Sequence, residues 1–165
     1  MNLNGRIRIL MLIAMFTVTS VTTAIAWGDI THEAIVSELK NPQVNLYQKY
    51  AKGGAVGVDM FYFLPNKEYY SVIAHTSRTA DLPREMLRVS GSSDNNKAYS
   101  YGWLSHAASD IQGHRYYVNP IAGTDMNLHT AVEIGVDANL VDLTSVQFNV
   151  PYGVVQTGYR NIYGS

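Results

Sequence analysis

Imidazole and carboxylate side chains recur at helical spacing in the second half of the sequence. His106, Asp110 and His114 follow one another at every fourth residue, and His129 and Glu133 repeat this step. A helix turns about 100° per residue, so steps of four drift only about 40° and leave such residues on one face. Imidazole nitrogen and carboxylate oxygen are the ligands that zinc accepts when no thiolate is present. The pattern therefore predicts two helices that enclose metal between them.

The rest of the histidine complement fits this interpretation. The sequence contains five histidines and no cysteine, and only His32 and His75 lie outside the two stepped sets. A single His–Asp pair four residues apart is often just a contact on a helix surface. Two stepped sets, in a chain with only 15% charged residues, favour metal binding over the surface interpretation.

The first 26 residues have the features of an export signal. Arg6 and Arg8 precede an uncharged apolar stretch, which is followed by hydroxyl-bearing residues and by the small residues Ala24–Ala26. This order predicts a signal peptide, residues 1–26, and a secreted or periplasmic protein. The alternative is an uncleaved membrane anchor, although the uncharged stretch is at the short end of the roughly 17–25 residues that a membrane helix needs.

Cleavage at this point would create a further metal ligand. Trp27 would become the first residue, and its α-amino group, whose pKa is near ~8, can lose its proton to a metal. The amine and the carbonyl oxygen of the same residue can close a five-membered chelate. The segment Trp27-Gly-Asp-Ile-Thr-His32 places this amine beside a histidine of the first predicted helix.

From Trp27 to Glu133 the sequence resembles the zinc-dependent phospholipase C family, to which a family of single-strand nucleases is related. The resemblance is carried by Gly57-Val-Asp59, by the segment from Tyr101 to Asp110 and by the order of nine ligand-type residues. It implies an all-α fold, a single-domain helix bundle over residues 27–143 that encloses a trinuclear zinc site. Glutamate at 133 favours the phospholipase branch over the nuclease branch. The spacing departs from the best-known members, whose last central histidine lies two residues later.

The resemblance distributes the nine ligands among three zinc ions. One ion would be held by Asp59, His75, His106 and Asp110. A second would be held by His114, His129 and Glu133. The third would be held by Trp27, His32 and Asp110, so that Asp110 bridges two ions. The resemblance also suggests Asp59 as a catalytic general base, and a simple ligand role is the alternative.

Three clustered zinc ions suit the hydrolysis of a phosphodiester. They neutralise its anionic oxygens and lower the pKa of bound water toward ~7, so that zinc-bound hydroxide can attack phosphorus. We expect a phospholipase C that cleaves the glycerol-side phosphodiester of phospholipids, with transient contact to a membrane surface and a monomeric state. Phe61, Tyr62 and Phe63 follow Asp59 directly and are candidates to line the substrate site.

Two other functions remain open. One is a single-strand nuclease or nucleotidase, and the other is a non-catalytic zinc-binding interaction protein. Removal of residues 1–26 would leave ten basic residues against thirteen acidic ones. Single-stranded nucleic acid is the less favoured substrate, because nothing in the sequence forms a basic patch.

Start and stop signals predict a series of helices joined by polar loops. The expected segments are Asp29 to Lys40, Pro42 to Gly53-Gly54 with Asn41 as N-cap, a short one carrying Asp59, Asp81 to Val89, Lys97 to Tyr117, and Asp125 to Leu143. Asn119-Pro120 would close the long helix. The tail, residues 144–165, mixes Val, Phe and Tyr with Gly and Pro, which predicts extended or irregular structure. It either packs over the bundle or is the start of a longer C-terminal part.

Overall fold

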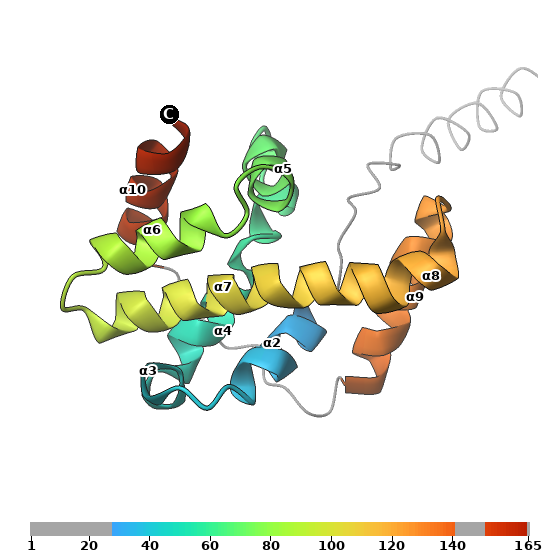
Figure 1. Cartoon of the computed structure of the whole chain (residues 1–165), viewed down its shortest axis with the longest axis horizontal. Coiled ribbons are helices and arrows are strands. Elements are labelled where there is room, and N and C mark those ends of the chain that lie inside the picture. Colours follow the sequence, from blue (N-terminus) through green and yellow to red (C-terminus); the bar gives the residue numbers. More distant parts are fainter. Residues whose placement is uncertain (1–27, 141–150, 165) are drawn as a thin grey trace, which may run out of the picture.

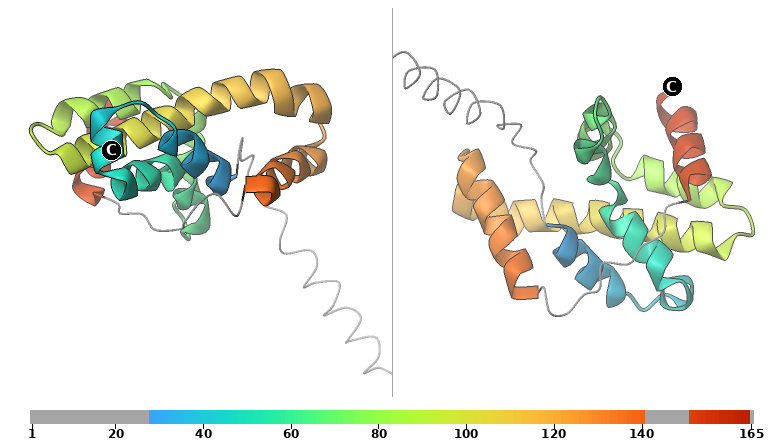
Figure 2. Two further views of the ribbon diagram at one scale, coloured as in Figure 1. Left: turned by 90° about the horizontal axis from the view of Figure 1, so that it is seen from below. Right: turned by 180° about the vertical axis from the view of Figure 1, so that it is seen from behind.

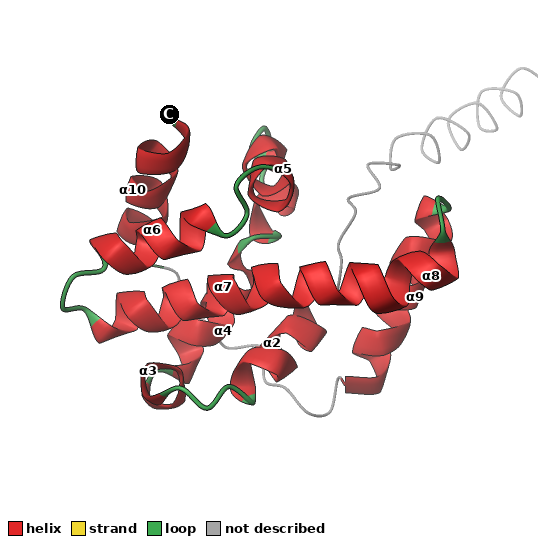
Figure 3. Cartoon of the chain, viewed as in Figure 1, coloured by secondary structure: helices red, strands yellow, loops and turns green. Residues whose placement is uncertain are grey.

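The computed structural model describes residues 28–140 and 151–164, and within these residues helices are joined by short loops with no strand (Figure 3). The predicted all-α helix bundle is confirmed. The α-helices are α2 (Asp29–Ser37), α3 (Pro42–Leu46), α4 (Gln48–Gly57), α5 (Glu68–Thr76), α6 (Asp81–Val89), α7 (Asp94–Gly113), α8 (Asn119–Ala122), α9 (Met126–Leu140) and α10 (Tyr152–Tyr163). A 3-10 helix, η1 (Met60–Phe63), and a π-helix, η2 (His114–Val118), interrupt the series. The predicted signal peptide and Trp27 lie outside the described residues.

The 20-residue helix α7 runs the length of the described fold, and the other helices are arranged around it (Figure 1). Helices α2, α3 and α4 pack along one side of α7, and α6 packs on another. Helices α8 and α9 lie at the C-terminal end of α7, and the view from behind shows α9 running back from there toward α2 (Figure 2). None of the described helices is both long and apolar enough to cross a membrane.

Helices α4 and α7 cross with their backbones in direct contact. A Cβ atom on Gly54 would lie 1.9 Å from the carbonyl oxygen of Tyr99, and a Cβ atom on Gly102 would lie 1.9 Å from the carbonyl oxygen of Ala51. Only glycine allows this approach, because any side chain would overlap backbone atoms of the partner helix.

The position of Gly53-Gly54 in the structure corrects one sequence prediction. Gly53-Gly54 was expected to end a helix that starts at Pro42. The helix is instead interrupted at Tyr47, and α4 continues through both glycines to Gly57. The prediction was wrong because the glycines serve close helix packing and not helix termination. The predicted N-cap is confirmed: Asn41 Oδ1 accepts hydrogen bonds from the backbone N–H groups of Gln43 and Val44, at 2.9 and 3.2 Å.

The long helix differs from its prediction at both ends. It begins at Asp94 and is capped by Ser93, whose hydroxyl accepts the Asn96 N–H at 3.4 Å. It ends at Gly113 and not at Tyr117, and Asn119-Pro120 does not close it: the π-helix η2 follows and leads directly into α8, where proline occupies one of the first two positions. Proline at the start of a helix costs no hydrogen bond.

The C-terminal segment forms a helix that completes the core. Val155 and Tyr159 of α10 are buried in one cluster with Leu82 and Met86 of α6. The Tyr159 hydroxyl also donates to the carbonyl oxygen of Tyr70 at 2.7 Å. The prediction of extended or irregular structure was therefore wrong for residues 152–163, where valine, glycine and tyrosine recur at helical spacing; residues 141–150 lie outside the described part. The described residues of the tail thus pack against the bundle.

Replacing Gly102 by alanine should weaken the crossing of α4 and α7. We expect Gly102→Ala to lower the free energy of unfolding by about 1–3 kcal/mol, as overpacking of a tight interface does. Gly135→Ala is the matched control, because a Cβ atom there meets open space and should stabilise α9 by about 0.5–1 kcal/mol. Urea unfolding of both variants at saturating zinc measures the difference, and equal effects would contradict the close-contact argument.

Candidate metal centre

Eight of the nine predicted ligands lie in the described residues, and the structure gathers all eight into three groups. Within each group the nitrogen and oxygen donors lie within 4.8 Å of one another. The groups are His32, Asp59 and His106; His75, His106 and Asp110; and His114, His129 and Glu133. The last group coincides with the set predicted for the second ion. Trp27, the ninth ligand, lies outside the described residues, so its role stays a prediction.

The four donors predicted for the first ion have the spacing of a zinc coordination shell. His75 Nε2 lies 3.1 Å from Asp59 Oδ1 and 3.4 Å from Asp110 Oδ2. His106 Nε2 lies 3.1 Å from Asp110 Oδ2, 3.9 Å from Asp59 Oδ2 and 3.0 Å from His75 Nε2. Ligands at 2.0–2.1 Å around a tetrahedral zinc are separated by about 3.3 Å. Four of these five separations, 3.0–3.4 Å, are those of ligands that share one tetrahedral zinc.

The outer nitrogens of these two histidines fix which nitrogen faces inward. His106 Nδ1 lies 2.7 Å from the carbonyl oxygen of Ala55, and His75 Nδ1 lies 2.7 Å from that of Ser71. A carbonyl oxygen only accepts, so each Nδ1 carries a hydrogen. In the neutral rings the two Nε2 lone pairs then face each other. Metal-binding histidines characteristically donate their other N–H in this way.

Buried polar atoms without hydrogen-bond partners are concentrated in this region. A buried polar atom without a partner is costly, and native proteins contain few of them. The predicted ligand atoms among them are both carboxylate oxygens of Asp59, Asp110 and Glu133, and Nε2 of His32, His114 and His129. All of these atoms are donors that zinc accepts, so the residues present fit the metal.

The group at the C-terminal end of α7 is the more open one. His129 Nε2 lies 2.8 Å from Glu133 Oε1, and His114 Nε2 lies 3.8 Å from the same oxygen. The His114 side chain is 30% exposed, against 2% for Glu133. His114 is the first residue of the π-helix η2, a type of turn that is often found at functional sites. The short spacing from Asp110 therefore does not prevent His114 from reaching this group.

Asp110 has the geometry of a bridging ligand. Its Oδ1 faces His32 Nε2 at 3.2 Å, whereas its Oδ2 faces His106 and His75. The rings of His32 and His106 are stacked, with their centroids 3.8 Å apart. Two carboxylate oxygens that point at different histidines can serve two ions.

The sequence did not reveal all the elements that hold the ligands. No helix was predicted around His75, which α5 carries near its C-terminal end. Asp29 was expected to cap the first helix, but this prediction was wrong: Gly28 is the N-cap, and the backbone N–H groups of Ile30 and Thr31 donate to Asp137 at 3.2 and 2.9 Å. Asp137 lies four residues after the ligand Glu133, a continuation of the same step, and joins the α9 ligands to helix α2.

Burial and neighbouring charge shift the pKa values of the ligands in opposite directions. Burial, together with the charges of Asp110 and Asp59, raises the pKa of Glu133 to about 9. Although burial opposes it, the adjacent carboxylates of Asp110 and Asp59 raise the pKa of His75 to about 10. Burial also opposes ionisation of Asp110, but His106, His32 and His75 hold its pKa far below the usual range. Without a metal, the cluster therefore holds protons that zinc must displace.

Comparisons with known proteins agree with this geometry. The model of a family described as zinc dependent phospholipase C matches residues 29–162. An uncharacterised protein from Archaeoglobus fulgidus is 24% identical over 176 aligned positions, which cover 94% of this chain and 51% of that protein. The chain thus spans about half the length of this relative. No solved structure is significantly similar to the chain.

Asp110→Asn should lower the zinc content by more than one ion per chain, because the two Asp110 oxygens face two different sets of histidines. Asp94→Asn is the control and should leave the zinc content unchanged, since Asp94 lies on the same helix, is 46% exposed and pairs with Lys97 at 3.6 Å. Elemental analysis of both purified variants measures the difference. Loss of one ion or none from Asp110→Asn would contradict the bridge.

Zinc binding at neutral pH should release protons. With pKa values raised to about 9 and about 10, Glu133 and His75 are protonated at pH 7, and zinc binds only their deprotonated forms. We expect these two groups to release about two protons and zinc affinity to rise with pH between 7 and about 9. Calorimetric titration with zinc in buffers of different ionisation enthalpy measures the release. Glu133→Gln should lower it, and zinc binding that releases no protons would rule out the expected protonation states.

Proposed function

The chain belongs to the zinc-dependent phospholipase C family, and from that premise we propose that it is an exported three-zinc hydrolase that cleaves the glycerol-side phosphodiester of phospholipids. The observation that carries the proposal is the convergence of eight zinc-type ligands, most of them buried, at one place in a fold of the same family. When bound, zinc supplies Lewis acidity, which stabilises charge on phosphoryl oxygens and makes a water molecule acidic.

The open ligand group is the proposed place of substrate entry. Three protein donors, from His114, His129 and Glu133, leave a four-coordinate metal one position for an external ligand. The His114 side chain is 30% exposed, more than that of any other ligand with a close charge partner in the centre. The side chains of Asp59 and His106 are almost fully buried. A phosphodiester arriving from solvent would therefore meet this group first.

Asp59 is the proposed catalytic carboxylate. Its side chain is fully buried, its Oδ1 faces His75 Nε2 at 3.1 Å, and its Oδ2 lies at the longer distance of 3.9 Å from His106 Nε2. Neither oxygen has a hydrogen-bond partner in the described residues, so with zinc bound Oδ1 would serve as a ligand and Oδ2, which lies farther from the histidines, would accept a proton from water. His106 and His75, held by the carbonyl oxygens of Ala55 and Ser71, keep Asp59 in this orientation.

The activity is tested on protein exported by its own signal sequence and loaded with zinc. Phosphatidylcholine vesicles, with release of diacylglycerol as the readout, test the phospholipase; single-stranded DNA tests the nuclease alternative. We expect lipid cleavage that a chelator abolishes and that zinc restores. If the zinc-loaded protein cleaves neither substrate, the result favours a non-catalytic zinc-binding protein. If it cleaves DNA alone, it is a nuclease and not a phospholipase.

One residue added before Trp27 should remove one zinc ion selectively. The proposal places the free amine of Trp27 beside His32, and an added residue converts this amine into an amide that cannot bind metal in the same way. The same residue added after Ser165 is the control. Elemental analysis and N-terminal sequencing of both proteins measure the outcome, and an unchanged zinc content in the N-terminal variant would exclude the amine as a ligand.

A further inference from the structure

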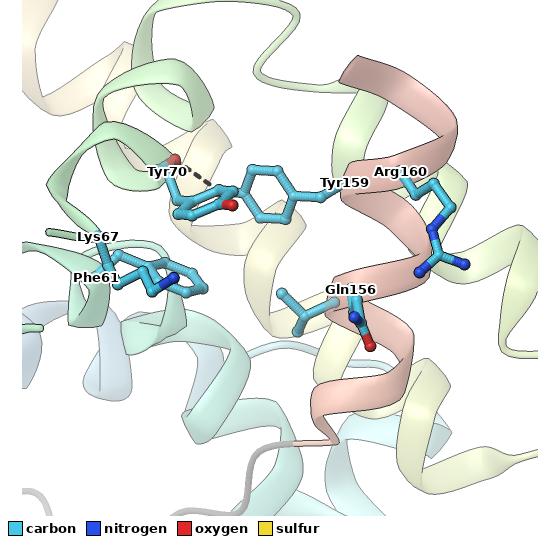
Figure 4. A pocket seen from close by; sticks show the side chains of 7 residues that line it. Phe61, Lys67, Tyr70, Gln156, Tyr159 and Arg160 are labelled. Carbon is cyan, nitrogen blue, oxygen red and sulfur yellow. Dashed lines mark hydrogen bonds between the residues drawn. The ribbon is translucent and has the colours of Figure 1, made fainter. Parts of the chain in front are cut away.

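A pocket of about 500 Å³ lies between α10 and the segment formed by η1 and the start of α5 (Figure 4). Its apolar lining comes from Phe61, Tyr70, Val155 and Tyr159. Val155 and Tyr159 are 5% and 4% exposed, so the inner wall belongs to the hydrophobic core. None of the eight described zinc-type ligands lines this pocket, which makes it a separate feature from the metal centre.

The polar part of the pocket is at its rim and is positively charged. Lys67, Gln156 and Arg160 are the polar lining residues with exposed side chains. Figure 4 shows Lys67 beside Phe61 on one wall and Gln156 and Arg160 on α10 at the other. Neither rim cation has a carboxylate partner among the described residues. The lysines and arginines that do form ion pairs there are Lys52, Arg78, Arg88 and Lys97.

One of the two tyrosine hydroxyls in the lining, that of Tyr159, is already engaged. Tyr159 donates its O–H to the carbonyl oxygen of Tyr70 at 2.7 Å, which also holds the two aromatic walls together. Lys67 Nζ lies 5.7 Å from the centroid of the Tyr70 ring, so the cation is held near the aromatic wall. The pocket thus offers an apolar interior and two rim cations that have no carboxylate partner in the described part of the chain, with no acidic residue in the lining.

We propose that this pocket binds a single-chain anionic amphiphile, with its chain over the aromatic floor and its head group at the rim, where Lys67 and Arg160 supply positive charge. The volume is within the roughly 300–1,000 Å³ range of small-molecule sites. Burial of the chain supplies the apolar contribution, and the anionic head forms charge-assisted hydrogen bonds with the two cations. A neutral amphiphile gains only the first contribution, and a cationic amphiphile is repelled at the rim.

The pocket adjoins the metal centre through one short segment. Phe61 lines the pocket and follows Asp59 by two residues, and the next ring, Tyr62, stacks on His75 with centroids 5.9 Å apart. The proposal does not depend on hydrolase activity, because binding is measured directly and the lining contains no zinc ligand. Of the aromatic residues after Asp59 that the sequence offered for a substrate site, only Phe61 lines this pocket.

The test is calorimetric titration of the zinc-loaded chain with decyl sulfate, decanol and decyltrimethylammonium, each below its micelle concentration. We expect saturable binding of one decyl sulfate per chain. Decanol should bind at least about tenfold more weakly, and decyltrimethylammonium should show no saturable binding. Equal binding of all three amphiphiles would overturn the proposal, because it would mean that the rim charges contribute nothing.

Variants of the rim place the binding in this pocket. Lys67→Met with Arg160→Met should weaken decyl sulfate binding by at least about tenfold without changing zinc content or helicity, since both side chains are exposed. Lys40→Met with Arg84→Met removes the same charges at exposed positions outside the pocket and should leave binding unchanged.

Equal loss in both double variants would show a nonspecific charge effect. Binding that survives the rim variants but disappears with a chelator would place the amphiphile at the metal centre. Either outcome overturns the proposal.

Discussion

The backbone contact between α4 and α7 is the constraint on which the metal centre depends. Ala51 and Ala55 are four residues apart on α4, and Gly102 and His106 are four residues apart on α7. Ala51 meets Gly102 where a Cβ atom cannot fit. Ala55 meets His106 through a 2.7 Å hydrogen bond from His106 Nδ1 to the Ala55 carbonyl oxygen. Because one face of each helix makes both contacts, the crossing that glycine permits also orients the central imidazole.

From this imidazole the rest of the centre follows by short distances. His106 stacks on His32 and faces His75, so ligands from α2, α5 and α7 surround one ring. Burying several carboxylates and imidazoles together is unfavourable unless positive charge compensates them. The stability of this region is therefore linked to zinc, because the free energy of metal binding also becomes folding free energy. Asp137 extends this coupling, since it joins the N-terminus of α2 to α9.

The parts predicted from sequence are those determined by local spacing. The steps of four from His106 to His114 and from His129 to Glu133 are helix periodicity, so the sequence places these ligands on two helix faces. Features that depend on a partner helix were missed or wrong. Glycine at 54 is a residue typical of helix ends, but it lies at a helix crossing. The partner of the α2 N-terminus, Asp137, is more than a hundred residues away in the sequence. Residues 152–163 were predicted as irregular because their glycines and valines are weak helix formers, and tertiary packing on α6 overrides that preference.

The two ends of the centre differ in how far their side chains are exposed to solvent. The side chains of His32 and Asp59 are fully buried and that of His106 is 1% exposed, whereas that of His114 is 30% exposed. A partly exposed group with three donors leaves a coordination position open to a ligand that arrives from solvent. We therefore expect substrate exchange at the junction of α7, η2 and α9. The amphiphile pocket is lined by η1, α5 and α10 instead, and only the short segment after Asp59 joins it to this chemistry.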